Sequence, residues 1–265
     1  SNSNKYLYFQ ENGHKYTDSY GNEYVSVTTI IGNYAPKFDK NYWLHKKARE
    51  LGISEKELSK RWQDITNEAC TRGSATHNGL EDGIKGNSMF KDAIQYLNQV
   101  DTGRCITVAD IPNLKAHPLD IEGFKKATNY KYQKIYDVFD YYINRGYTIY
   151  SEIGVFLPEL LISGTIDVLA IRPDKFVILD WKTNKELEKD FTVRNDIRMK
   201  PPMGDFQDTA LSHYTLQFNL YQKMFESVGL KIVDRRLIWL KDDGSYEVRY
   251  IPKLDDKIMN TILNG

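Results

Sequence analysis

The chain has 265 residues, enough for one large domain or two small ones, and its 41% hydrophobic and 27% charged residues are ordinary for a soluble globular protein. No apolar run approaches the roughly 18 residues of a membrane span and no signal-peptide pattern opens the chain, so we expect no membrane partner. Two cysteines, Cys70 and Cys105, indicate a reducing compartment and cannot supply the four ligands of an iron–sulfur cluster. The 36 basic and 36 acidic residues cancel, so any attraction to nucleic acid must come from a local patch.

The first half of the chain is predicted to open with short strands and to continue as helices. Ser54 and Glu57 form a capping-box pattern at the start of one of these helices. Strands are expected at Tyr6–Phe9 and Tyr24–Ile31, and helices at Lys40–Leu51, from Ser54 to about Cys70, again after Gly73, and at Met89–Gln99. Asp101–Asp120 contains two prolines and little periodicity, which predicts a loop or mobile connection.

The second half is predicted to hold the core sheet. Glu122–Arg145 has apolar residues near period 3.6 and is expected to be one helix that ends at Gly146. Later elements are a strand at Tyr147–Leu157, a hairpin of Leu161–Ile171 and Phe176–Trp181, a helix at Ser212–Val228, a hairpin of Lys231–Lys241 and Tyr246–Ile251, and a helix at Leu254–Leu263. The central hairpin is apolar at nearly every position, so helices should cover both of its faces. The sequence therefore predicts an α/β (α+β) fold with a central mixed sheet flanked by helices. Residues 1–265 should form a single domain, with a helical region at about 40–145 covering the core sheet at 147–251.

The central hairpin also carries charges in an apolar setting. Asp167 lies on its first arm, and Asp180 and Lys182 lie two residues apart on its second arm, so the latter two project from the same strand face. Buried charges cost several kcal/mol each unless they are paired or bound to metal. One interpretation is an Asp–Lys ion pair that only fixes strand register. A second carboxylate nearby favours a site for a hard divalent cation instead, because two close carboxylates repel.

These residues follow a pattern across three strands. Glu152, then Gly164-Thr165-Ile166-Asp167, then Asp180-Trp181-Lys182 resemble the PD-(D/E)XK nuclease superfamily. Two helical motifs resemble its RecB-like exonuclease branch, which includes the mitochondrial genome-maintenance exonuclease: Gln217-Phe218-Asn219-Leu220-Tyr221, and Gly73-Ser74-Ala75-Thr76-His77 with Glu81 four residues later. Val27–Ile31 followed by Phe38-Asp39 is similar to the opening of phage-encoded members. The resemblance implies a restriction-endonuclease-like core without an iron–sulfur cluster.

The resemblance also implies roles around a metal ion. Asp167, Asp180 and the backbone carbonyl of Trp181 would bind Mg²⁺ or Mn²⁺, with His77 as a further ligand; a capping or core histidine is the alternative. Lys182 would orient or deprotonate the attacking water, and its pKa is expected to fall where a cation and burial oppose its charge. Glu152 would complete the metal shell or hold a second cation, or else face outward beside a lysine.

The remaining candidate residues surround these ligands. Gln217 and Tyr221 lie one turn apart and could contact a strand backbone or support the site, although simple packing is open for Tyr221. Glu81 could orient His77 or join the metal shell. Phosphate contacts, or alternatively a solvated face, are expected of five basic residues: Lys185, Lys189, Arg194, Arg198 and Lys200.

The function implied is a Mg²⁺- or Mn²⁺-dependent DNA exonuclease acting on single-stranded or end-bearing DNA. Its expected setting is phage or bacterial recombination, replication or repair in the cytoplasm, with a recombination or single-strand-binding protein as a candidate partner. The alternatives are a catalytically silent nucleic-acid-binding module of the same fold and a structure-specific or site-specific endonuclease.

Overall fold

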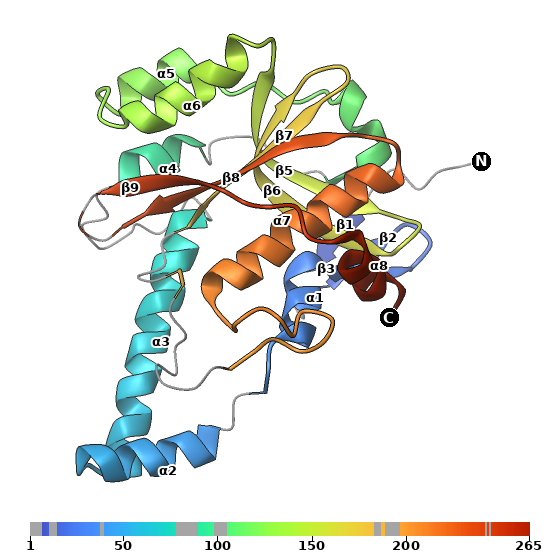
Figure 1. Ribbon diagram of the computed structural model, residues 1–265. Coiled ribbons are helices and arrows are strands. Elements are labelled where there is room, and N and C mark those ends of the chain that lie inside the picture. Colours follow the sequence, from blue (N-terminus) through green and yellow to red (C-terminus); the bar gives the residue numbers. More distant parts are fainter. Residues whose placement is uncertain are drawn as a thin grey trace.

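The computed structural model describes residues 7–10, 15–37, 40–77, 90–97, 105–182, 187–188, 197–241, 243 and 245–265. In this part of the chain a mixed sheet of nine strands has helices packed on both of its faces (Figure 1). The predicted α+β class, with a central sheet flanked by helices, is confirmed.

The sheet follows the order β1-β2-β3-β6-β7-β8-β9; β5 also pairs with β6, and β4 pairs with β5. Its strands are β1 Leu7–Gln10, β2 Lys15–Asp18, β3 Glu23–Ser26, β4 Cys105–Thr107, β5 Thr148–Leu157, β6 Ile162–Ile171, β7 Phe176–Lys182, β8 Ile232–Leu240 and β9 Tyr246–Tyr250. The pairs β3–β6, β4–β5 and β7–β8 are parallel, whereas β5–β6, β6–β7 and β8–β9 are antiparallel. Both predicted hairpins in the second half of the chain are thereby confirmed.

One edge of β6 is shared by two strands. β3 pairs with it at Ile162 and Ser163, and β7 pairs with it from Val168 to Ile171. Among the described strands, neither neighbour pairs with Gly164–Asp167 on this edge. We call this four-residue gap the fork.

Helices on the two faces enclose two hydrophobic cores (Figure 1). On one face lie α1 (Val27–Tyr34) and α7 (Ala210–Ser227), and on the other lie α5 (Ile121–Ala127) and α6 (Gln133–Ile143). Side chains of β7 alternate between these cores, since Phe176 and Ile178 belong to the α7 side and Val177, Leu179 and Trp181 to the α6 side. The same alternation places Asp180 and Lys182 on the α7 side.

The remaining helices include an arm that stands away from the sheet (Figure 1). It consists of α2 (Lys40–Leu51) and α3 (Glu55–His77); α4 (Lys91–Leu97) and the terminal α8 (Asp256–Asn264) complete the set. Ser54 caps α3 as predicted, because its Oγ accepts the backbone N–H of Glu57 at 3.1 Å. None of the described helices is both long and apolar enough to cross a membrane.

Four predictions about the elements were wrong. The strand expected at Tyr24–Ile31 ends at Ser26, whose Oγ accepts the Thr29 N–H at 3.1 Å and opens α1. The single helix expected at Glu122–Arg145 is divided between α5 and α6, with Asn129 and Tyr130 at φ 48° and 56° in the connection. Helix α3 continues through Gly73 to His77 without the expected break. The loop expected at Asp101–Asp120 holds β4 and a short 3₁₀ helix, η1 (Val108–Asn113).

Candidate active site

Three acidic residues occupy one row across β5, β6 and β7. Ser151 pairs with Val168 and Ile153 with Ile166, so Glu152 lies opposite Asp167 in the same register. Val168 pairs with Leu179, and the next position of that register sets Asp180 opposite Asp167. Directly opposed residues on neighbouring strands are the closest side-chain neighbours in a sheet. The strand register therefore gathers the three predicted carboxylates at the mouth of the fork.

Glu152 holds its place with a strained backbone. Its φ of 52° lies in the left-handed region, which a residue with a side chain adopts at a cost of about 1–3 kcal/mol. The apolar residues of β5 change sides at this point: Ile149, like Tyr147 just before the strand, belongs to the α6 core, whereas Ile153, Val155 and Leu157 belong to the α7 core. Strand β5 thus turns over at the residue that faces Asp167.

The row brings three acidic groups together largely away from solvent. Asp167 is only 7% exposed and Asp180 only 4%. Burial, followed by the charges of Asp167 and Asp180, raises the pKa of Glu152 to about 9, although Lys182 acts in the opposite direction. The Oε1 atom of Glu152 is buried and has no hydrogen-bond partner among the described residues. Without a further cation, Glu152 is therefore protonated at neutral pH.

Among the described residues, Lys182 supplies the positive charge beside this row. Its Nζ lies 3.0 Å from Oδ2 of Asp180 and 4.7 Å from the centre of the Tyr214 ring, and the residue is 9% exposed. Burial lowers the pKa of Lys182, but the charges of Asp180 and Asp167 outweigh burial and raise it above the ordinary value. The fall expected from the sequence assumed a bound cation; with the carboxylates as its neighbours, Lys182 is an ammonium ion.

The donor atoms suit a hard divalent cation. Carboxylate oxygens, such as those of Glu152, Asp167 and Asp180, are ligands that Mg²⁺ and Mn²⁺ prefer. The buried Oε1 of Glu152 accepts no hydrogen bond from the described residues, so a cation could bind it. In their present positions no three Asp, Glu, His or Cys side chains of the described residues form a ready metal site. His77 is the last residue of α3, and its side chain and all of Glu81 lie outside the described part of the chain.

Helix α7 closes the site with one face. Gln217 and Tyr221 lie on it one turn apart, and the Tyr221 hydroxyl donates to the backbone carbonyl of Thr165 at 2.8 Å, inside the fork. Burial, then Asp180 and Asp167, raise the pKa of Tyr221, while hydrogen bonds from the Gln217 side chain and at Thr165 act against this rise. A Cβ added to Gly164 would come within 2.5 Å of the Tyr221 hydroxyl. The glycine of the predicted Gly-x-x-Asp motif is thus the residue that lets the tyrosine reach the backbone of the fork.

One residue of the site was missed in the sequence. Tyr214 precedes Gln217 by three positions and Tyr221 by seven, so helical periodicity from the predicted motif could have identified it. The contact between Gly164 and Tyr221 joins segments 57 positions apart, and sequence spacing gives no signal for such a contact.

Of the five basic candidates for phosphate contacts, Arg198 and Lys200 are described. Both are exposed, and both donate to backbone carbonyls: Arg198 to Asp205 at 2.8 Å and Lys200 to Asn33 at 3.1 Å. These bonds secure the loop before α7. Lys185, Lys189 and Arg194 lie outside the described residues.

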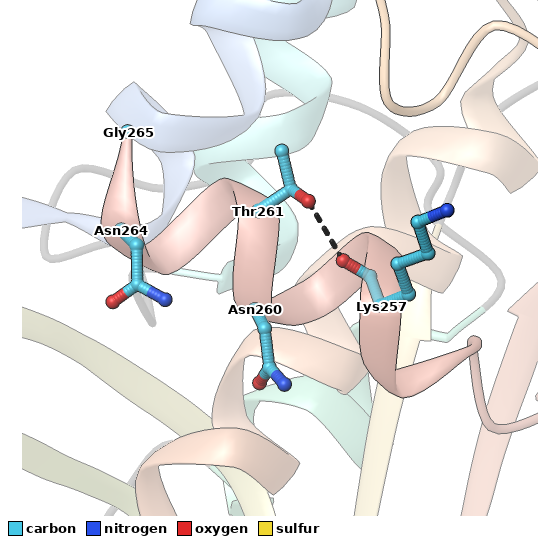
Figure 2. A pocket seen from close by; sticks show the side chains of 5 residues that line it. All are labelled: Lys257, Asn260, Thr261, Asn264 and Gly265. Atoms are coloured by element: carbon cyan, nitrogen blue, oxygen red, sulfur yellow. Dashed lines mark hydrogen bonds between the residues drawn. The ribbon is translucent and has the colours of Figure 1, made fainter.

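A hollow on α8 is separate from this site. Figure 2 shows its lining by Lys257, Asn260, Thr261, Asn264 and Gly265, with a volume of 640 Å³. The Thr261 hydroxyl donates to the Lys257 carbonyl at 2.8 Å, and no lining residue is acidic or belongs to β5, β6, β7 or α7. This surface therefore offers none of the chemistry found at the carboxylate row.

Comparison with known proteins finds a partial likeness. The chain is 31% identical over 93 residues to an ATP-dependent helicase/nuclease subunit of Carboxydothermus hydrogenoformans, a match that covers 35% of this chain and 7% of that protein. No protein-family model matches the chain. The likeness to a helicase/nuclease subunit is therefore distant and limited to a small part of the larger protein.

Proposed function

We propose that this chain is a metal-dependent deoxyribonuclease of the RecB-like exonuclease type, which hydrolyses phosphodiester bonds of single-stranded or end-bearing DNA. The observation that carries the proposal is the buried row of Glu152, Asp167 and Asp180 beside Lys182. Three strands deliver these groups in the order of the nuclease motif. The distant likeness to a helicase/nuclease subunit supports the same class of activity.

In this proposal Asp167 and Asp180 hold Mg²⁺ or Mn²⁺, together with the Trp181 carbonyl, and Glu152 joins them. His77 from the end of α3 is a further candidate ligand. When bound, the cation would polarise the phosphate and make water more acidic. It would also offset the mutual repulsion of the carboxylates, which adds to burial in raising the pKa of Glu152.

Lys182 acts as a positive hydrogen-bond donor in this reaction. In the protein without a bound cation, the charges of Asp180 and Asp167 raise its pKa despite burial. An ammonium in this position orients water and stabilises the negative charge that develops on the phosphate oxygens. Tyr221 holds the backbone of the fork, so that Asp167 stays fixed on β6, and the Gln217 side chain is hydrogen-bonded to Tyr221.

We place the enzyme in the cytoplasm, in bacterial or phage DNA recombination, replication or repair. A partner that supplies unwound DNA, such as a recombination or single-strand-binding protein, fits an enzyme in which Asp167 and Asp180 are almost fully buried.

The test is digestion of end-labelled linear DNA, single-stranded and double-stranded, with Mg²⁺, with Mn²⁺ and with a chelator. We expect cleavage with either metal, none with the chelator and none by Asp180→Asn. Tight DNA binding without cleavage under every condition would favour a silent nucleic-acid-binding module of the same fold.

Metal binding has a readout that needs no cleavage. A ligand that binds only the folded state at a hundred times its Kd stabilises that state by about 2.7 kcal/mol. Mn²⁺ should therefore raise the melting temperature of the wild-type protein by several degrees and leave that of Asp180→Asn unchanged. An equal shift in both proteins would place the cation elsewhere.

A further inference from the structure

The buried ammonium of Lys182 has two kinds of neighbour in the described part of the chain. One is the Asp180 carboxylate at 3.0 Å, and the other is the ring of Tyr214, whose centre lies 4.7 Å from Nζ. Asp180 is also a proposed metal ligand. A bound cation would compete for its oxygens, and the Tyr214 ring is the neighbour of Lys182 that such a cation leaves in place.

Burial makes this ring contact stronger than similar contacts on the surface. Lys46 lies over Tyr42 and Arg145 over Tyr141, and both of these tyrosines are about half exposed. Lys182 is 9% exposed. A cation over an aromatic face is attracted more strongly when water is excluded, because less hydration competes with the ring.

Helix geometry fixes the ring where it is. Tyr214, Gln217 and Tyr221 follow the spacing i, i+3 and i+7 on α7, so they share one face. Tyr221 is tied to the Thr165 carbonyl at the other end of this face, and the Thr209 hydroxyl, which accepts the Ser212 N–H at 3.2 Å, caps the start of the helix. The position of Tyr214 over Lys182 is therefore set by the same element that closes the fork.

We propose that Tyr214 is a positioning residue for Lys182: its ring face holds the ammonium beside Asp180 and keeps it aimed at the reacting phosphate. This inference rests on the proposed nuclease function for its kinetic consequence. The contact itself does not depend on that function, so the two can fail separately.

The kinetic test compares Tyr214→Phe, which keeps the ring, with Tyr214→Leu, which removes it. We expect Tyr214→Phe to stay within about threefold of the wild-type kcat and Tyr214→Leu to lose about tenfold, with KM for DNA unchanged, as a desolvated cation–ring contact predicts. In a Lys182→Ala background Tyr214→Leu should cause no further loss. Tyr141→Leu, which removes a cation–ring contact on α6, is the matched control and should leave kcat unchanged.

Two outcomes of this test would overturn the proposal. An equal loss in Tyr214→Phe and Tyr214→Leu would assign the effect to the hydroxyl group. A rise in KM, or a loss that persists in the Lys182→Ala background, would make Tyr214 a DNA contact or a packing residue.

A second measurement stays informative even if the wild-type protein cuts no DNA. The melting temperatures of Tyr214→Phe and Tyr214→Leu are compared in the wild-type and in a Lys182→Met background. We expect the leucine variant to melt about 2–4 °C below the phenylalanine variant when Lys182 is present, a shift typical of one contact in a protein of this size. This difference should vanish with Lys182→Met. An equal difference in both backgrounds would show that the ring does not act through Lys182.

Discussion

Glu152 combines two features that each oppose folding. Its backbone is left-handed at φ 52°, and its carboxyl group lies buried beside Asp167 and Asp180. Strain of this kind persists only where the surrounding structure enforces it, and it is concentrated at functional sites. Glu152 therefore lowers the stability of the protein, and it is also the residue that completes the carboxylate row.

Glu152→Gly should therefore stabilise the metal-free protein and abolish its cleavage of DNA. Glycine adopts positive φ without strain, so we expect the free energy of unfolding to rise by about 1 kcal/mol, net of the extra entropy of the unfolded chain. Urea unfolding of both proteins measures the change. Leu161→Gly is the matched control, because Leu161 also has φ 52° but lies in the turn between β5 and β6. It should gain stability and keep its activity; a less stable Glu152→Gly would contradict the prediction.

Lys182→Ala should lose most cleavage and keep its affinity for DNA. The expected loss is on the order of 10²-fold or more, the usual range for a positioned group that transfers or orients a proton. Single-turnover cleavage and a filter-binding assay on the same oligonucleotide separate the two quantities. Near-normal turnover would reduce Lys182 to the partner of a structural ion pair.

Asp18 gives a pH dependence that is independent of the site. Its buried carboxylate accepts the backbone N–H groups of Tyr20 and Asn22 at 2.9 and 3.0 Å. Burial raises the pKa of Asp18. These bonds and those from the Asn22 and Tyr24 side chains lower it by more than burial raises it, so the pKa of Asp18 is lowered overall. The stabilisation is therefore complete above the unfolded pKa of about 4 and is lost as the pH falls through the lower, folded pKa.

Asp18→Asn should be less stable than the wild-type protein by about 1 kcal/mol at pH 7. The difference should shrink steadily below pH 4. Urea unfolding at several pH values measures it, and a difference that is independent of pH would show that the charge of Asp18 has no part in it.

At the scale of whole elements, α7 and the fork depend on each other. The carbonyl of Thr165 has no strand on its open edge and is satisfied by a helix side chain instead, through the Tyr221 hydroxyl at 2.8 Å. Gly164 leaves the space that the ring fills. One glycine and one tyrosine thus join the helix to the strand that carries Asp167.

Gly164→Ala and Tyr221→Ala should therefore be strongly non-additive. The first variant places a methyl group 2.5 Å from the hydroxyl and should cost about 1–3 kcal/mol, and the second empties a buried site and should cost about 3–5 kcal/mol. The double variant should be more stable than the sum of the two losses predicts by at least about 1 kcal/mol, because the clash no longer exists. Denaturant unfolding of the wild-type protein, the two single variants and the double variant gives the four free energies of this double-mutant cycle. Additive losses would show that Gly164 and Tyr221 are not in contact.

The elements that could be predicted are those whose local pattern agrees with their packing. The hairpin of β6 and β7 was predictable from its apolar runs and the turn between them, and α7 was predictable from its amphipathic pattern. The predicted hairpin already placed Asp167 near Asp180 and Lys182. The β-branched run Val27–Ile31 predicted a strand, yet the Ser26 cap and packing against α7 made it a helix. The division of Glu122–Arg145 depends on two residues with positive φ, neither of which is a glycine, and periodicity cannot reveal such a turn. Contacts between segments far apart in the sequence, such as Gly164 with Tyr221, could not be predicted from the sequence either.

At the scale of the molecule, burial of the carboxylate row limits what can reach it. Asp167 and Asp180 are 7% and 4% exposed on the sheet face that α7 covers, and the arm of α2 and α3 stands apart from the sheet (Figure 1). A single strand can enter such a site more readily than a duplex approaching from the side. The zero net charge of the chain is consistent with this, because a short channel for a single strand needs only a local lining of basic residues.

Covalently closed circles of single-stranded DNA should therefore resist cleavage that degrades linear strands of the same length. The rates are compared on a gel at equal nucleotide concentration with Mg²⁺ or Mn²⁺. A circle nicked once beforehand is the control and should be degraded like the linear strand. Equal rates on intact circles and linear strands would identify an endonuclease.

The carboxylate row and Lys182 all come from residues 152–182, which form three consecutive antiparallel strands. Contacts between neighbours in sequence form quickly, whereas the parallel pairing of β7 with β8 must wait for the chain that includes α7. We therefore expect the carboxylates to meet early during folding, before α7 can exclude water from them. At that stage their repulsion slows the closing of the strands, and solvent cations screen it. Divalent ions should then speed the folding of the chain, in addition to any role that they have in the finished protein.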